Sequence, residues 1–229
     1  MITTFNTTPL SAQVENALKE QILSGRLPPG QRIDLQSLAK AWNVSPTPLR
    51  DAARSLATQG LVSVSPRRGV FVAAVDKKAL KEIFELRMAL ECAATELATP
   101  IVPLQEVEDA LAAYKRARDA TSERERLKAL AAIDNLIHDV ILRNCGNSRL
   151  IKIMNGLRDQ VRWSQQTIIA QVPEPYNDTL PEHIRIAEAV CRRDTAAAVA
   201  AMREHLESAY RRVVSRLESA GETTAARED

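Results

Sequence analysis

A short stretch of strand-like residues interrupts an otherwise helical pattern, and this interruption most constrains the fold. Apolar and β-branched residues fill 61–64 and recur over 70–75, with Ser-Pro-Arg-Arg-Gly at 65–69 between them. Such a pattern predicts a β-hairpin with two arginines at its tip. On both sides of the hairpin, apolar positions recur every three or four residues, as in amphipathic helices. The sequence therefore predicts a mainly α fold with one small, basic-tipped hairpin.

Three short helices are expected before the hairpin, at about 11–25, 35–42 and 45–59. Ser45 can cap the third helix, and Pro46 then occupies the first turn, where its missing N–H costs nothing. Three helices followed by a basic hairpin are the element order of a winged helix-turn-helix. We therefore expect residues 1–75 to form such a domain.

After Asp76 the helical pattern continues almost to the end of the chain. Six helices are expected, at about 77–99, 103–119, 123–145, 148–171, 178–193 and 195–219. The alanine-rich and leucine-rich composition of this part favours close helix packing. We therefore expect an all-α six-helix bundle over 77–220, followed by a flexible tail over 221–229.

Charge and cysteine usage narrow the class of protein. Residues 1–75 carry eight basic and four acidic side chains, whereas the rest carries 23 and 25, so a polyanion partner is expected for the first part only. The three cysteines are far apart and form no CxxC pair, as in a reduced protein. The N-terminus has no signal-peptide pattern, and no apolar run approaches the length of a membrane span. We therefore expect a cytoplasmic protein without a membrane partner.

The helix over 45–59 is the candidate reader of DNA, because an α-helix fits the major groove. Its first turns present Thr47, Arg50 and Arg54, and the two arginines are four residues apart, hence on one face. Arginine can contact phosphates or bind guanine edges through two hydrogen bonds. These residues are predicted to contact double-stranded DNA.

The tip of the hairpin adds a second candidate contact. Arg67 and Arg68 would lie over the neighbouring groove or backbone, and Gly69 would let the wing approach DNA closely. The alternative is a set of solvated arginines on a small helical domain. The order of three helices and a basic hairpin favours DNA binding.

The three histidines of the chain all fall on inward helix faces of the C-terminal part. These are His138, His183 and His205, and Asp134 precedes His138 by four residues at the margin of the same face. Buried polar groups need partners, and a divalent metal would satisfy all four together. Zinc is favoured, and nickel, manganese or iron also suit this ligand set. The alternative is that each histidine is hydrogen-bonded separately in the core.

Arg87 also lies on an inward, apolar helix face. It could clamp a carboxylate effector near the metal, or form a structural ion pair with Glu91 one turn later, and both interpretations remain open. Two rival functions compete with regulation: a metal-dependent hydrolase on the bundle, and a bundle with no ligand. We find no added general base or nucleophile for a hydrolase, and a DNA-binding head is hard to explain in an enzyme.

Residues 29–72 resemble the DNA-binding domain of the GntR family of bacterial regulators. The resemblance rests on Pro29-Gly30, Leu38-Ala39, Val44-Ser45, Thr47-Pro48-Leu49-Arg50-Asp51-Ala52, Leu56, Gly60-Leu61-Val62 and Gly69. It implies a homodimeric transcription regulator, most often a repressor, on a palindromic operator. The family often has an arginine where this chain has Pro46, which implies a different operator sequence.

The later segments ELRMALECAATELA, DNLIHDVILRNCGN and PEHIRIAEAVCRRDTAAAVAAMREHLESA resemble the FCD ligand-binding domain of the FadR group, in its six-helix, VanR-like version. The resemblance covers about residues 78–215. It implies a metal held by Asp134, His138, His183 and His205, and a small organic acid as effector. Asn147 matches a position of that domain and is a candidate effector contact together with Arg87.

Overall fold

The computed structural model describes residues 9–73, 77–122, 125, 129, 132–171 and 179–225, which divide into two compact units. In the described part of the chain, residues up to 73 join residues 156–171 in one unit. Residues 77–155 and 179–225 belong to the other unit. Val75, the expected end of the hairpin, lies outside the described residues.

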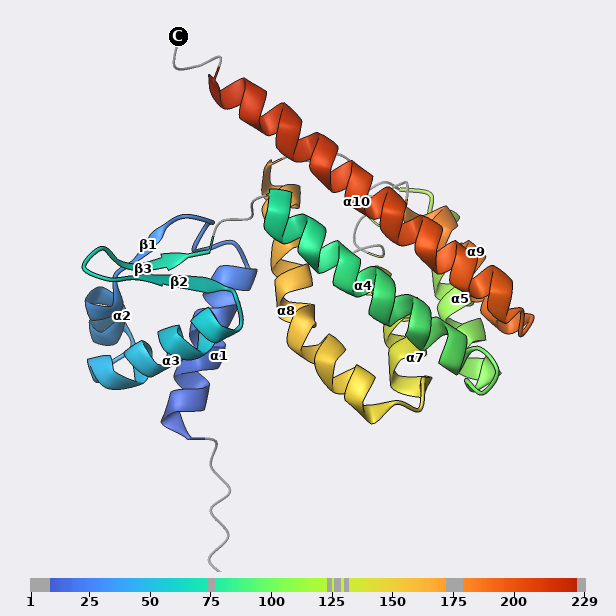
Figure 1. Cartoon of the computed structure of the whole chain (residues 1–229), viewed down its shortest axis with the longest axis horizontal. Coiled ribbons are helices and arrows are strands. Elements are labelled where there is room, and N and C mark those ends of the chain that lie inside the picture. The colour runs from blue at the N-terminus through green and yellow to red at the C-terminus, as the bar shows by residue number, and fades with distance from the viewer. Residues whose placement is uncertain are drawn as a thin grey trace, which may run out of the picture. The chain divides into compact units, whose positions relative to one another are not determined.

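The N-terminal unit is the predicted winged helix-turn-helix (Figure 1). It contains α1 (Leu10–Leu23), α2 (Leu35–Ala41), α3 (Pro46–Thr58), β1 (Arg32–Ile33), β2 (Val62–Ser65) and β3 (Gly69–Val72). The strands form an antiparallel sheet in the order β1-β3-β2, so the hairpin gains a third strand. Local sequence does not reveal β1, because it is two residues long and pairs with β3, where Arg32 lies opposite Phe71.

The two helices of the turn motif begin in different ways. Asp34 caps α2, since its carboxylate accepts hydrogen bonds from the N–H groups of Gln36 and Ser37 at 3.0 and 3.1 Å. Ser45 occupies the N-cap position of α3, but its side chain makes no capping hydrogen bond. Pro46 starts that helix as expected, because its fixed φ suits the first turn.

The core of the N-terminal unit includes a residue from far along the chain. Trp163, in the second half of α8 (Ser148–Gln171), is buried among apolar side chains of the winged domain. Lys19 pairs with Asp159 at 2.7 Å, and Gln160 Nε2 donates to the Gln59 carbonyl at 2.7 Å. Residues 156–163 thus complete the DNA-binding unit, although periodicity assigns them to the helical bundle.

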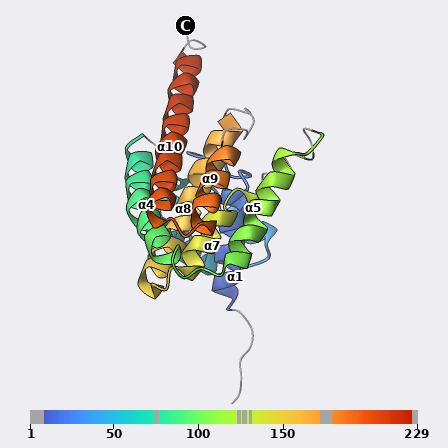
Figure 2. The ribbon, with the colours of Figure 1, turned by 90° about the vertical axis from the view of Figure 1, so that its right-hand side faces the viewer.

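The second unit is all-α, as predicted (Figure 2). It contains α4 (Lys77–Ala98), α5 (Leu104–Arg118), α7 (Leu136–Asn144), the first turns of α8, α9 (Thr179–Cys191) and α10 (Thr195–Ala225). Helix α10 packs along α4 and α9, while α5 packs on α9 and α7 on α4. α10 continues to Ala225, beyond the helix end expected at 219. None of the described helices is both long and apolar enough to cross a membrane.

One helix prediction is wrong at a place that matters for the site. The sequence pattern predicts a continuous helix over 123–145, but Asp134 and Asn135 form a turn and α7 begins after them. Asp and Asn side chains compete for backbone hydrogen bonds and favour such breaks. Tyr114 secures the start of α7, because its hydroxyl accepts a hydrogen bond from Ile137 N–H at 2.9 Å.

Candidate DNA-binding surface and histidine cluster

Helix α3 separates an apolar face from a basic one. Its buried residues are Leu49, Ala52, Ala53 and Leu56. Thr47, Arg50 and Arg54 are exposed. Arg54 lies 3.8 Å from Asp51, and its side chain is 77% exposed, so this pair is weak and leaves the guanidinium accessible. The burial of one face therefore presents the predicted DNA contacts on the other.

The wing tip holds Arg67 and Arg68 on an exposed turn. The N–H of Arg68 donates to the Ser65 carbonyl at 3.2 Å, and Pro66 and Arg67 occupy the central positions. Arg67 has a φ of 63°, the conformation required at the third position of a type II turn. The turn thus presents two adjacent guanidinium side chains to solvent.

Gly69 follows this turn with a φ of 115°, where a side chain would be strained. A Cβ there would also lie 3.2 Å from Nε of Arg32. Arg32 therefore lies against the wing, as a further basic residue that sequence reasoning missed. Only the pairing of β1 with β3 brings it there, so no local signal could have revealed it.

The structure brings the three histidines of the chain together from three helices. His138 lies on α7, His183 on α9 and His205 on α10, with one nitrogen of each within 4.8 Å of the other two. The Nε2 atoms of His138 and His183 are 3.3 Å apart. His183 and His205 are only 2% and 4% exposed, and Tyr114 stacks on the His183 ring. Among the described residues, these three form the group with metal-ligand spacing.

A buried carboxylate supports His138 from behind. Glu91, on α4, contacts Nδ1 of His138 through Oε2 at 2.5 Å and accepts a hydrogen bond from Arg87 Nε through Oε1 at 2.7 Å. This confirms the Arg87–Glu91 ion pair that sequence analysis held open. Because Glu91 engages Nδ1, the Nε2 atom of His138 remains available to the cluster.

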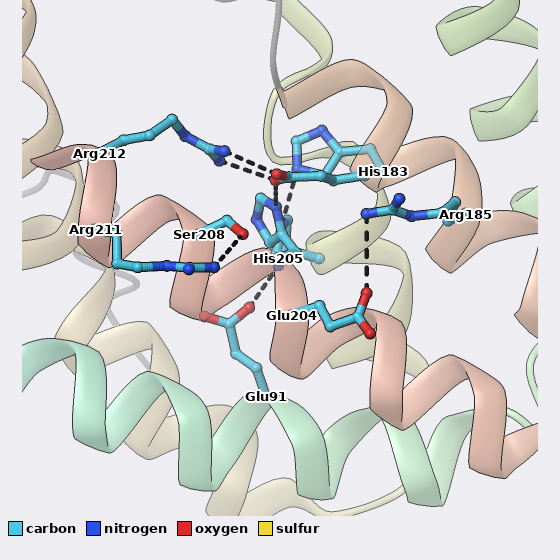
Figure 3. A network of polar contacts seen from close by, with 10 residues as sticks. Glu91, His183, Arg185, Glu204, His205, Ser208, Arg211 and Arg212 are labelled. Carbon is cyan, nitrogen blue, oxygen red and sulfur yellow. Dashed lines mark hydrogen bonds and ion pairs between the residues drawn. The ribbon is translucent and has the colours of Figure 1, made fainter.

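His205 has the same kind of support from a different helix. Its Nδ1 contacts Oε2 of Glu182 at 2.7 Å, and Arg212 donates two hydrogen bonds to Glu182 at 2.8 and 2.9 Å. Figure 3 shows Arg212 and Glu91 reaching the imidazoles from opposite sides. Two Arg–Glu–His arrangements thus meet at one group of histidines.

The charges of these groups follow from their surroundings. Burial alone would raise the pKa of Glu91, but the Arg87 charge and the His138 contact hold that pKa well below its usual range. Against the same burial effect, Arg212 and His205 lower the pKa of Glu182 to about 2. Burial lowers the pKa of His205 to about 4 and that of His183 well below its ordinary value. Both imidazoles are therefore neutral at pH 7, as metal ligands must be.

The remaining predicted site residues lie apart from this cluster or next to it. Asp134 is half-buried in the turn before α7, and its carboxylate is not among the converging ligand atoms. Burial raises the pKa of Asp134. Arg87 is 4% exposed and lies over the Phe84 ring at 5.1 Å. Asn147 is exposed, and its Oδ1 accepts a hydrogen bond from Leu150 N–H at the start of α8.

Sequence reasoning missed Glu182 and Arg212. Glu182 directly precedes a predicted ligand, His183, but adjacent residues on a helix do not share a face. Its partners His205 and Arg212 lie 23 and 30 residues away, so only the packing of α9 on α10 joins them.

Two family models match this chain. One, described as bacterial regulatory proteins of the gntR family, matches residues 10–72, and the FCD domain matches residues 82–208. The FCD match alone covers more than half of the sequence. The chain belongs to the GntR family and carries an FCD domain. This GntR protein is accordingly a transcription regulator, and the family does not favour the rival hydrolase.

Relatives match over most of the GntR regulator's length. The HTH-type regulator YdhC of Bacillus subtilis is 29% identical over 83% of this chain and 85% of its own. The Escherichia coli repressor RspR is 25% identical over 88% of this chain and 87% of its own. The E. coli repressor GlaR is 26% identical over 82% of this chain and 89% of its own.

Solved structures share the fold. A GntR regulator from Rhodococcus has a TM-score of 0.75 and 22% identity, covering 91% of this chain and 99% of its own. E. coli McbR/YncC has a TM-score of 0.72 and 22% identity, covering 92% of this chain and 100% of its own. At this identity the likeness supports the architecture alone.

Proposed function

We propose that this GntR regulator is a repressor that binds a palindromic operator as a homodimer and responds to a small carboxylate held at a metal-containing histidine cluster. The convergence of three buried histidines in the FCD domain carries the proposal. In the N-terminal unit, exposed arginines on α3 and the wing supply the complementary surface for DNA.

The DNA-binding part of the proposal assigns α3 to the major groove and the wing to the adjacent backbone or minor groove. Thr47, Arg50 and Arg54 contact DNA from α3, and Arg67, Arg68 and Gly69 from the wing. A single head reads few base pairs, whereas two heads on a palindrome multiply specificity. Two relatives, RspR and GlaR, are named as repressors, which favours repression over activation.

The metal-binding part rests on the chemistry of the donor set. Two of the three imidazoles are kept neutral by burial, and two are oriented by carboxylates, as is common for histidine ligands of metals. His138, His183 and His205 would hold the ion, with Asp134 as the fourth ligand. Zinc is favoured, and nickel, manganese or iron also fit. The metal would supply positive charge for a carboxylate oxygen.

Arg87 is the second candidate contact for that carboxylate. Its Nε atom is bonded to Glu91, but in the described part of the chain its two terminal amino groups donate no hydrogen bond. A buried guanidinium with free donors suits an anionic ligand, which can accept two parallel hydrogen bonds. Asn147 has no part in this proposal, because its amide oxygen already caps α8.

The test measures operator binding and its release by carboxylates. Purified protein is titrated onto labelled duplexes from the DNA flanking its own gene, in metal-loaded and chelator-stripped forms, with a panel of small mono-, di- and tricarboxylates. Specific binding that one carboxylate weakens only in the metal-loaded form is expected. Carboxylate response of equal size in both forms would show that the metal has no part in effector binding.

Replacing Glu182 by glutamine should weaken metal binding about tenfold or more, because the neutral amide no longer fixes and polarises His205. The dissociation constant is measured by competition with a chromophoric chelator. Glu204→Gln is the matched control, since Glu204 is exposed on the same helix and lies 4.0 Å from Arg185. Equal metal affinity in the two variants would contradict a supporting role for Glu182.

A further inference from the structure

An open groove runs between α4 and α10 on the FCD domain, apart from the histidine cluster. The two helices lie side by side and antiparallel, with Phe84 packed on Tyr210 at 5.4 Å (Figures 1 and 2). The groove encloses about 790 Å³, and its floor is largely apolar. Met88, Ala89 and Val199 contribute to this floor. The established roles of the domain leave this surface unused.

The outer face of α4 extends the apolar surface beyond the groove. Leu86 and Leu97 are 50% and 43% exposed, which is unusual for leucines only three turns apart on one helix. Ala89 and Ala93 lie between them along the same side of α4, and Ala89 is exposed. Small residues flanked by leucines allow another helix to approach closely and to pack leucines on either side.

The charges around the groove are balanced. Lys81, Arg203 and Arg211 are opposed by Glu85, Glu96 and Glu207. Among residues whose side chains the structure describes, Glu96 and Arg203 have no ion-pair partner. A strongly acidic or basic partner would meet equal attraction and repulsion here. A second copy of the same surface can match each charge with its opposite.

The positions of these charges favour a two-fold arrangement. If α4 of two copies crossed antiparallel near Ala89, Lys81 of each copy would face Glu96 of the other, because the two residues lie eight before and seven after the crossing point. A two-fold axis forms this contact twice. We propose that a second copy of this chain packs here, α4 against α4, with leucines of each copy entering the α4–α10 groove of the other.

This assignment rests on the proposed function only in that a palindromic operator requires two DNA-binding heads. The full-length Ala89→Arg variant tests it, because a two-fold axis would bring two buried guanidinium groups together. Sedimentation equilibrium should show dimerisation weakened on the order of 100-fold or more. Ala17→Arg, at an exposed position of α1, is the matched control and should dimerise like the unmodified protein.

A gain-of-contact variant guards against simple misfolding. In a Cys191→Ser background, Ala89→Cys should form a disulfide-linked dimer under mild oxidation, since residues near a two-fold axis meet their own counterparts. Ala17→Cys in that background should stay uncrosslinked. A monomeric unmodified protein, or Ala89→Arg and Ala89→Cys proteins that behave like their controls, would overturn the interface.

The outcomes separate this inference from the proposed function. An Ala89→Arg protein that still dimerises and represses removes the interface but leaves operator binding intact. A protein that dimerises through Ala89 and binds no DNA from its own locus keeps the interface and removes the regulator proposal.

Discussion

Arg50→Ala should weaken operator binding by at least about 30-fold. One lost arginine contact to a base or phosphate costs about 1–3 kcal/mol, and a palindromic operator loses it from both heads. Arg50 is exposed on α3, one turn before Arg54, and the opposite face of the helix is buried. The variant should therefore fold normally. Fluorescence anisotropy with the labelled operator measures the change.

The salt dependence of the same titration tells which contact Arg50 makes. Loss of a phosphate contact lowers the slope of log affinity against log salt by about one per head, whereas loss of a base contact leaves the slope and relaxes specificity. Arg26→Ala is the matched control, because it removes the same charge from the loop after α1. Unchanged affinity in Arg50→Ala would mean that α3 does not enter the groove as proposed.

His183→Ala should abolish specific metal binding and the thermal stabilisation that metal provides. His183 is the most buried of the three histidines, and its Nε2 faces that of His138. A metal present at a thousand times its dissociation constant stabilises the fold by about 4 kcal/mol, which corresponds to roughly 10 °C in Tm for a chain of this size. Metal content of the purified protein and thermal unfolding with and without chelator measure both effects.

Two comparisons sharpen this result. Glu204→Ala, at an exposed position of α10, should keep both metal and stabilisation. Asp134→Ala tests the fourth ligand separately, because Asp134 lies in a turn outside the histidine group. Metal affinity unchanged by Asp134→Ala would limit the protein ligands to the three histidines. A folded His183→Ala protein that retains one tightly bound metal would remove the cluster as the site.

The two Arg–Glu–His arrangements suggest why the cluster can be buried before metal arrives. Each carboxylate is balanced by a guanidinium, and each supports one neutral imidazole, so no isolated charge is buried. The cluster is therefore preorganised by α4, α7, α9 and α10 together, and binding does not have to assemble it.

Periodicity predicted most of the fold and half of the site. The change from helical to alternating patterns at 61–75 located the wing, and inward helix faces located the three histidines. These features are local, since one face of each element must be apolar to be buried. Asp134 shows the limit: its spacing from His138 suggested one helix, but the turn at Asp134 and Asn135 separates it from the cluster.

The sequence by itself determined which segments are helices or strands and which side of each is buried, because these follow from side-chain periodicity. Only the tertiary structure decided which buried groups meet. It paired Arg32 with the wing, placed Trp163 in the DNA-binding unit and joined Glu182 to His205. Such pairings depend on how helices and strands pack across long chain separations, and no local pattern encodes the partner.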